Sequence, residues 1–397
     1  MYRPELLAPA GDLQRLKIAI LYGADAVFIG GKLFSLRAKA NNFTLKDIEE
    51  GVQFAHQHHA KVYVTVNIVP NEADFEGLSK YLLELDRLQV DAIIVSSITV
   101  LMQAKALRCH FEIHISTQHS ILNSKAVQFF KQLGADRVVL ARELNINQIR
   151  DIKEKTSFPL EVFIHGGMCS SFSGRCTLSN AMVQRDANKG GCAHSCRWLY
   201  QLYCQDKLIH PDYISLASFD LMALNYLPSL IDAKIDSFKI EGRMKSMYYI
   251  ANVVKIYREF IDLYCSSQQI SKKQMQYFKN ELQKIESRSL SEVFFNPHFK
   301  NEGLLSHVKS KNANQSFVGI VLKDSDQLNC TFVEQRNHFT IDSLLEAIRP
   351  KAPNQPLRIL KMWDLDDNEI TIANHPQQIL KIQFSEALKK DTFLRRK

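Results

Sequence analysis

The stretch Gly23-Ala-Asp-Ala-Val-Phe-Ile-Gly30 gives the clearest indication of how this chain folds. A Gly-Ala-Asp turn runs directly into a short apolar segment, which is typical of the place where a helix ends and a buried strand begins. The same turn recurs as Gly134-Ala-Asp136, and Ala233-Lys-Ile-Asp236 precedes a similar segment. Repeated helix-to-strand turns of this kind predict an α/β fold with a parallel sheet.

Eight segments within the first 245 residues have the composition of such strands, namely residues 5–10, 24–30, 61–67, 91–97, 112–117, 136–142, 160–165 and 237–241. Amphipathic stretches of helical period, such as residues 45–58 and 75–88, lie between most of them. Eight repeats, without a glycine-rich dinucleotide loop, favour a TIM-like (β/α)8 barrel. A doubly wound open sheet is the main alternative.

The sequence divides into three predicted parts. Residues 1–246 are assigned to the barrel, with a cysteine-rich insert at 167–200 after the seventh strand. Residues 247–310 are expected to form a helical extension and linker, because 247–266 and 272–285 have helical apolar spacing and 294–314 is polar. Short alternating segments and a turn at Asp366-Asp-Asn368 predict a small C-terminal all-β domain at 311–397.

Composition limits the class of protein. The chain has 397 residues, 46% of them hydrophobic, and a formal net charge of +8. The positive charge suits an anionic partner such as RNA or a polycarboxylate, and it is equally compatible with ordinary surface charge. No apolar segment is long enough to span a bilayer, and the first residues lack the features of a signal peptide. We therefore expect a soluble, cytoplasmic protein with no membrane partner.

Four of the eight cysteines, Cys169, Cys176, Cys192 and Cys196, follow the seventh strand with the spacing C-x6-C-x15-C-x3-C. In a reducing compartment such a group predicts metal ligation rather than disulfides. The long gaps favour an iron–sulfur cluster over structural zinc, which usually uses two compact pairs, although zinc and a metal-free loop remain alternatives. The other cysteines are predicted to be small buried hydrophobic residues: Cys109, Cys204, Cys265 and Cys330.

Catalytic groups of a barrel lie at the carboxyl ends of its strands. There the sequence places the basic residues Arg37, Arg142, Arg243 and Lys245, which are candidates to bind a carboxylate or phosphate, with ordinary loop charge as the alternative. His165 ends the seventh strand and is a candidate to position a substrate or donate a proton; a structural histidine is equally compatible. Glu241 ends the eighth strand and is the second candidate catalytic residue.

Several common hydrolase patterns are missing from the sequence. It contains no H-E-x-x-H motif, no G-x-S-x-G motif and no P-loop. The sequence alone therefore identifies no nucleophile and base for peptide hydrolysis.

The segment Glu161–Ser179 resembles the signature of the collagenase-like peptidase family, family U32. The matching pattern is E-x-F-x2-G followed by C-x4-6-G-x-C-x-aliphatic-S. Further stretches resemble the same family: Glu5-Leu-Leu-Ala-Pro-Ala-Gly-Asp12 and residues 37–43, 186–198, 218–221 and 236–246. The resemblance covers nearly the whole chain, including the C-terminal β region.

The resemblance implies an enzyme rather than a binding protein. Better understood members resemble oxygen-independent hydroxylases that carry a 4Fe-4S cluster on four cysteines. Branches act on tRNA wobble uridine, ribosomal RNA or quinone precursors, and the RNA branches are expected to need prephenate. The two-domain length is most similar to the tRNA uridine hydroxylase branch, which makes 5-hydroxyuridine.

Carried over residue by residue, the resemblance assigns Cys169, Cys176, Cys192 and Cys196 to the cluster. It also implies tRNA as a partner, and a paralogous subunit or a ferredoxin-type electron donor as further partners. The alternatives are a collagenase-like peptidase, a hydroxylase of ribosomal RNA or of a quinone precursor, and a non-catalytic RNA-binding factor with structural zinc.

Overall fold

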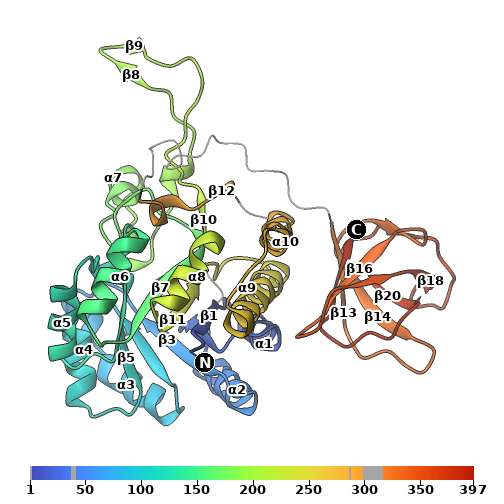
Figure 1. Cartoon of the computed structure of the whole chain (residues 1–397), viewed down its shortest axis with the longest axis horizontal. Helices are drawn as coiled ribbons and strands as arrows, with labels where there is room; N and C mark the ends of the chain where they lie inside the picture. The colour runs from blue at the N-terminus through green and yellow to red at the C-terminus, as the bar shows by residue number, and fades with distance from the viewer. Residues whose placement is uncertain (1, 37–41, 286–287, 298–315) are drawn as a thin grey trace.

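The computed structural model describes residues 2–36, 42–285, 288–297 and 316–397 (Figure 1). Eight parallel strands form one closed sheet, because the last of them pairs with both the first and the seventh. These strands are β1 (Glu5–Pro9), β2 (Ala26–Gly30), β3 (Lys61–Val66), β4 (Ala92–Val95), β5 (Glu112–Ile115), β6 (Arg137–Val139), β7 (Leu160–Gly167) and β11 (Ser237–Ile240). Closure confirms the TIM-like barrel and all eight predicted strands, and it rules out the open sheet.

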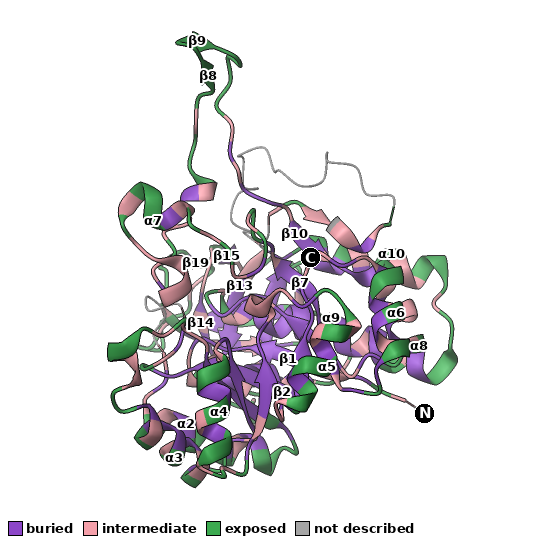
Figure 2. Ribbon diagram, turned by 90° about the vertical axis from the view of Figure 1, so that its left-hand side faces the viewer, coloured by how far each residue is buried: buried purple, intermediate pink, exposed green. Residues whose placement is uncertain are grey.

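Helices alternate with these strands and form the outer layer of the barrel. They are α1 (Leu13–Leu21), α2 (Leu45–Gln57), α3 (Leu78–Arg87), α4 (Ile98–Ala106), α5 (Ser124–Gln132), α6 (Ile146–Lys155) and α8 (Leu227–Asp232). Short polar side chains begin several of them: Thr44 and Asn145 each form a reciprocal capping box with the third residue of the helix. Figure 2 shows the buried strands inside and the exposed faces of the helices outside.

The interior of the barrel contains a ladder of buried charges. Glu161, which is fully buried, accepts from Lys239 Nζ at 2.7 Å and lies 3.3 Å from Arg137 Nη1. Arg137 also pairs with Glu5 at 2.6 Å, and the Tyr63 hydroxyl donates to the same carboxylate. Two anions and two cations therefore compensate one another, as buried charges require. Lys239 is the member of the ladder closest to the carboxyl ends of the strands.

A long excursion separates β7 from α8. It contains α7 (Leu178–Val183) and the hairpin β8 (Tyr203–Cys204) and β9 (Lys207–Leu208), which stands away from the barrel in Figures 1 and 2. The chain then returns as β10 (Asp220–Met222), which runs antiparallel to the end of β7 and pairs with β12 (Leu290–Ser291). The excursion therefore continues well beyond residue 200, where the sequence placed its end.

Beyond the barrel, α9 (Met247–Ser267) and α10 (Lys272–Gln283) form the two expected helices. The C-terminal domain is an antiparallel seven-stranded sheet in the order β17-β16-β21-β13-β14-β20-β18. Its strands are β13 (Phe317–Val321), β14 (Cys330–Gln335), β16 (Leu345–Ile348), β17 (Gln355–Leu357), β18 (Ile359–Trp363), β20 (Ile379–Phe384) and β21 (Phe393–Arg396), and a separate pair is formed by β15 (Phe339–Thr340) and β19 (Ile372–Ala373). The all-β prediction is confirmed, whereas most of the predicted linker and the boundary at 310–311 lie outside the described residues.

Buried contacts join the β domain to the helices. Arg395 pairs with Glu281 of α10 at 2.6 Å and also with Glu346 of β16. The Tyr22 hydroxyl donates to the carbonyl of Ile348 at 2.8 Å, and Tyr248 stacks on Phe317. Within the part of the chain that the structure describes, no helix combines the length and apolar character needed to cross a bilayer.

Candidate functional site

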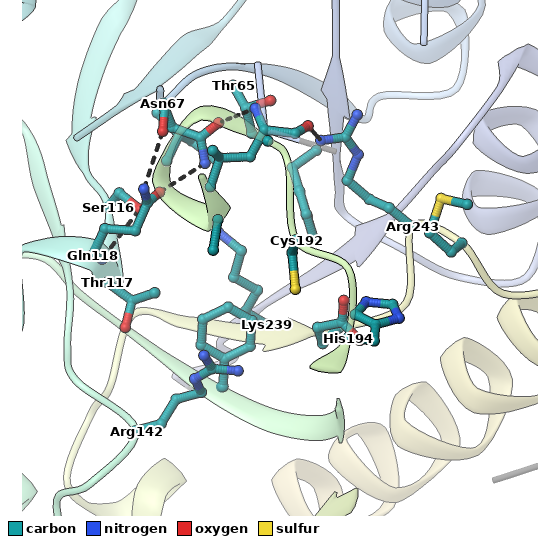
Figure 3. Close-up of a pocket in the computed structure, with 18 of the residues that line it drawn as sticks. Thr65, Asn67, Ser116, Thr117, Gln118, Arg142, Cys192, His194, Lys239 and Arg243 are labelled. Carbon is teal, nitrogen blue, oxygen red and sulfur yellow. Dashed lines mark hydrogen bonds between the residues drawn. The ribbon is translucent and has the colours of Figure 1, made fainter. Parts of the chain in front are cut away.

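A pocket of about 400 Å³ opens at the end of the barrel where the strands have their carboxyl ends (Figure 3). We call this end the mouth. Apolar side chains of Phe28, Ile94 and Phe163 line it together with polar side chains of Asn67, Gln118 and Lys239. The excursion supplies a further group of lining residues: Arg185, Ala187, Gly190, Cys192, Ala193 and His194. The pocket therefore lies between the strand ends and the segment that carries the cysteines.

Lys239 brings a positive charge to the apolar part of this pocket. Its Nζ lies 4.5 Å from the ring centroid of Phe28 and 5.4 Å from that of Phe163, while it donates to Glu161. The ammonium is held in place by one carboxylate and two ring faces, and it retains donor capacity for a ligand. The sequence prediction missed Lys239 as a site residue. Its signal was the alternation of side chains along the predicted strand 237–241, which puts residues 239 and 241 on one face.

Two of the predicted basic residues, Arg142 and Arg243, line the pocket. Arg142 Nη1 donates to the carbonyl of Gly167 at 2.9 Å, and its guanidinium lies 5.3 Å from the ring centroid of Phe163. Arg243 is only 5% exposed and donates to Asn42 Oδ1 at 2.7 Å and to Ser35 Oγ at 3.2 Å. These bonds hold both guanidinium groups in the pocket wall.

Of the other two predicted basic residues, the structure describes one, and it lies outside this lining. Lys245 lies over the ring of Tyr249, with Nζ 5.1 Å from its centroid, and is not part of the pocket lining. Arg37 lies outside the described residues.

Glu241 lines the pocket, and its catalytic role stays a prediction. Its Oε2 accepts from the backbone N–H of Gly167 at 3.3 Å, and its carbonyl accepts from the Tyr249 hydroxyl at 3.0 Å. The residue thus links the end of β11 to the end of β7, directly before the cysteines.

His165 lies behind the pocket wall, where it contacts α9 instead of a substrate site. The pairing of β7 with β11 shifts register here, because Lys239 pairs with Phe163 while Ile240 pairs with His165. The imidazole packs against Tyr249 and Tyr257, and its Nδ1 lies 3.2 Å from the Tyr257 hydroxyl. Burial lowers the pKa of His165 to about 3, with Lys245 adding to the effect. A buried, neutral ring fits the structural alternative, and a catalytic role for His165 stays a prediction.

The four cysteines of the excursion all have free thiols. Cys192 lines the pocket, and Cys169 lines an adjacent cavity with Glu143 and Phe172. Burial raises the pKa of the Cys196 thiol, and Cys169 and Cys192 add to the increase. Cys176 is held through its carbonyl, which accepts from Asn188 Nδ2 at 3.3 Å.

The arrangement of donor groups in the excursion bears on whether it can hold a metal. Among the residues that the structure describes, no three His, Cys, Asp or Glu side chains stand together as a formed metal site. The donor chemistry nevertheless fits a soft metal centre, since four thiols outside any disulfide share one excursion. The metal centre therefore stays a prediction. Of the remaining cysteines, Cys265 is buried as predicted, Cys109 and Cys330 are only partly buried, and Cys204 is exposed on the hairpin, where the prediction was wrong.

The excursion is attached to the barrel mouth at several points. Ser173 donates its backbone N–H to Glu143 Oε1 at 2.9 Å, and Ser120 donates its hydroxyl to the carbonyl of Ser173. Gly174 has a φ of +72° and packs so closely that a Cβ there would collide with the carbonyl oxygen of Gln118. Only glycine suits both the backbone conformation and the contact. The cysteine segment is thus in direct contact with a residue of the pocket wall.

Residues 11–304 match the family model for Peptidase family U32, and residues 313–395 match the model for the Peptidase family U32 C-terminal domain. The chain belongs to peptidase family U32. This confirms the family that the cysteine signature indicated, and the two matches follow the barrel and the β domain of this U32 protein.

Relatives within family U32 carry different names. The chain is 41% identical over 403 residues to tRNA hydroxylation protein P1 of Bacillus subtilis, with 99% of this chain and 95% of the relative covered. It is 40% identical to the 23S rRNA 5-hydroxycytidine C2501 synthase of Escherichia coli, over 66% of this chain and 40% of that protein. It is 34% identical to a collagenase of Porphyromonas gingivalis, with 66% of each chain covered.

Proposed function

We propose that this U32 protein is an RNA hydroxylase that acts in the cytoplasm and forms 5-hydroxyuridine at the wobble position of tRNA. The observation that carries the proposal is the 41% identity to tRNA hydroxylation protein P1 across 99% of this chain. The pocket supports it, because its apolar faces and hydrogen-bond donors suit a flat base rich in carbonyl oxygens. The target base would leave its stack and enter the mouth.

The residues of the pocket would then have separate roles. Lys239 would donate to a carbonyl oxygen of the base and fix the orientation of the ring in the pocket. Arg142 and Arg243 would bind the carboxylates of prephenate, the proposed co-substrate, since guanidinium groups match carboxylates in shape and charge. Phe28 and Phe163 would exclude water from the reacting face.

We also propose that Cys169, Cys176, Cys192 and Cys196 hold a 4Fe-4S cluster beside this pocket. Such a cluster supplies electron transfer without oxygen. A ferredoxin-type donor or a paralogous subunit is the proposed partner for this step. Protein purified without oxygen should contain iron and sulfide, and Cys176→Ser should lose both, whereas Cys265→Ser, a change at a cysteine away from the excursion, should keep them. Zinc without iron or sulfide would contradict the cluster.

Nucleoside analysis tests the proposed reaction. The tRNA of a strain lacking this protein should be digested, and its nucleosides should be measured by mass spectrometry. We expect 5-hydroxyuridine and its derivatives to disappear and to return when the wild-type protein is supplied. Unchanged modification in a strain without a paralogue would refute the proposal.

Peptide hydrolysis is the second candidate function. The collagenase relative favours it, and Cys192 and His194 line the same pocket as a thiol and an imidazole. In that case the purified protein should cleave gelatin, and Cys192→Ala should abolish the cleavage. If a strain lacking the protein loses the tRNA modification and the purified protein cleaves no gelatin, the hydroxylase is the function supported.

A further inference from the structure

Asn67 and Gln118, at the ends of β3 and β5, form an amide pair in the pocket wall (Figure 3). Gln118 Nε2 donates to the backbone carbonyl of Asn67 at 3.1 Å, and Asn67 Nδ2 donates to Gln118 Oε1 at 2.9 Å. The backbone N–H of Leu36 donates to Asn67 Oδ1 at 3.1 Å. A backbone carbonyl can only accept and a backbone N–H can only donate, so these two contacts determine which way both amides face.

This orientation leaves donors for a ligand. Gln118 Oε1 accepts from Asn67 and from the Ser116 hydroxyl at 3.0 Å, which uses both of its lone-pair directions. Each amide nitrogen carries two hydrogens, and among the described residues each makes a single hydrogen bond. The pair therefore offers N–H groups to the pocket, next to the donors of Lys239 and Arg142.

We infer that Gln118, positioned by Asn67, selects the base by its C4 substituent and accepts uracil over cytosine. This inference rests on the proposed function. Uracil presents a carbonyl oxygen at C4, which can accept from Gln118 Nε2, whereas cytosine presents an amino group there and would oppose one donor with another. C5 is bonded to C4, so a contact at this oxygen holds the reacting carbon one bond away. A site built to hydrogen-bond one group discriminates strongly against an analogue that cannot pair.

Binding measurements test this without turnover. Labelled anticodon stem–loops, identical except for uridine or cytidine at the wobble position, are titrated with the full-length protein and followed by fluorescence anisotropy. We expect the uridine RNA to bind at least about tenfold more tightly. A third RNA with pyrimidin-2-one at that position, which has no C4 oxygen, should lose the advantage of uridine. This RNA series keeps the test valid even if a protein variant fails to fold.

The protein variant is Gln118→Met, which keeps the length of the side chain and removes the donor. It should weaken binding of the uridine RNA, leave the cytidine RNA unchanged and bring the ratio close to one. The matched control is Gln103→Met on α4, outside the pocket lining, where the Gln103 amide donates to the Ser79 hydroxyl. The ratio of uridine to cytidine RNA affinity of this variant should equal that of the wild type.

Equal binding of uridine and cytidine RNA by the wild type, or a preference that survives Gln118→Met, would overturn the inference. If the wild type makes 5-hydroxyuridine in cells and yet binds both RNAs equally, only this inference fails. If 5-hydroxyuridine is not formed at all, the proposed function fails, whatever the ratio of affinities.

Discussion

Lys239 has the most consequential single side chain in the pocket, because it joins the buried charge ladder to the proposed substrate. Lys239→Met removes the cation and leaves Glu161, which is fully buried, with Arg137 as its remaining ion-pair partner. Breaking a buried pair costs about 3–5 kcal/mol, so we expect both hydroxylation and the free energy of unfolding to fall. Urea denaturation and nucleoside mass spectrometry measure the two effects.

The double variant Lys239→Met with Glu161→Gln separates these effects. Removing both charges should recover much of the stability, since no uncompensated carboxylate remains, while 5-hydroxyuridine stays absent. Recovery of modification together with stability would show that Lys239 only supports the fold.

His165 makes a prediction about pH. Its pKa in the folded protein is lowered to about 3 by burial, whereas the unfolded chain has the ordinary value of about 6.5. Below about pH 6.5 the unfolded state therefore binds the extra proton, and stability falls as the pH falls toward 3. The free energy of unfolding of the wild type should lose about 1.4 kcal/mol more per pH unit than that of His165→Gln between pH 6 and 4. Equal slopes in urea titrations would contradict a buried neutral histidine.

The sequence predicted the site residues that depend on topology alone. Arg142, Glu241 and Arg243 line one pocket because the carboxyl ends of parallel strands share a mouth. His165 does not join them because a register shift between β7 and β11 accompanies its turn toward α9, and no residue pattern marks that shift. Lys239 was missed since a lysine within a strand is ordinarily solvent-exposed, and its buried partner Glu161 comes from a distant segment.

At the level of elements, the excursion depends on its contact with the barrel mouth. Gly174→Ala should push the excursion away from Gln118, because the added Cβ meets the Gln118 carbonyl. We expect 5-hydroxyuridine formation to fall at least about tenfold, as small misplacements of catalytic groups cost rates of this order or more.

Gly77→Ala is the matched control for this change. Gly77 has a similar φ of +78°, but a Cβ there would have no neighbouring atom within 4 Å. Both variants have a similar backbone penalty, on the order of 1 kcal/mol. Only Gly174→Ala adds the collision with the Gln118 carbonyl, so its denaturation midpoint should fall further. If Gly77→Ala reduced modification as much as Gly174→Ala, backbone strain alone would account for the effect.

For the whole molecule, the strands of the barrel were predicted more completely than those of the C-terminal domain. All eight barrel strands were predicted, whereas β16 and β21 were not, and in β21 the successive Arg395 and Arg396 interrupt the apolar pattern. Arg395 is in fact buried between Glu281 and Glu346. Its role as the link between the β domain and α10 depends on partners far away in the sequence.

Arg395→Met should therefore destabilise the protein by about 3 kcal/mol or more, because it leaves the nearly buried Glu281 without its main partner. Lys389→Met, which removes an exposed pair with Asp324, should cost at most about 1 kcal/mol. Urea denaturation of the full chain compares the two. Similar losses would mean that the buried link contributes no more than a surface pair.

The exposed hairpin β8–β9 affects the solubility of this protein. A two-stranded ribbon has two edges with outward peptide groups, and Leu202, Tyr203 and Ile209 of this one are exposed to water. Open edges beside apolar side chains promote pairing between molecules. Aggregation at high protein concentration should therefore begin at this hairpin. Replacing the hairpin with a short glycine–serine loop should raise the solubility of the protein.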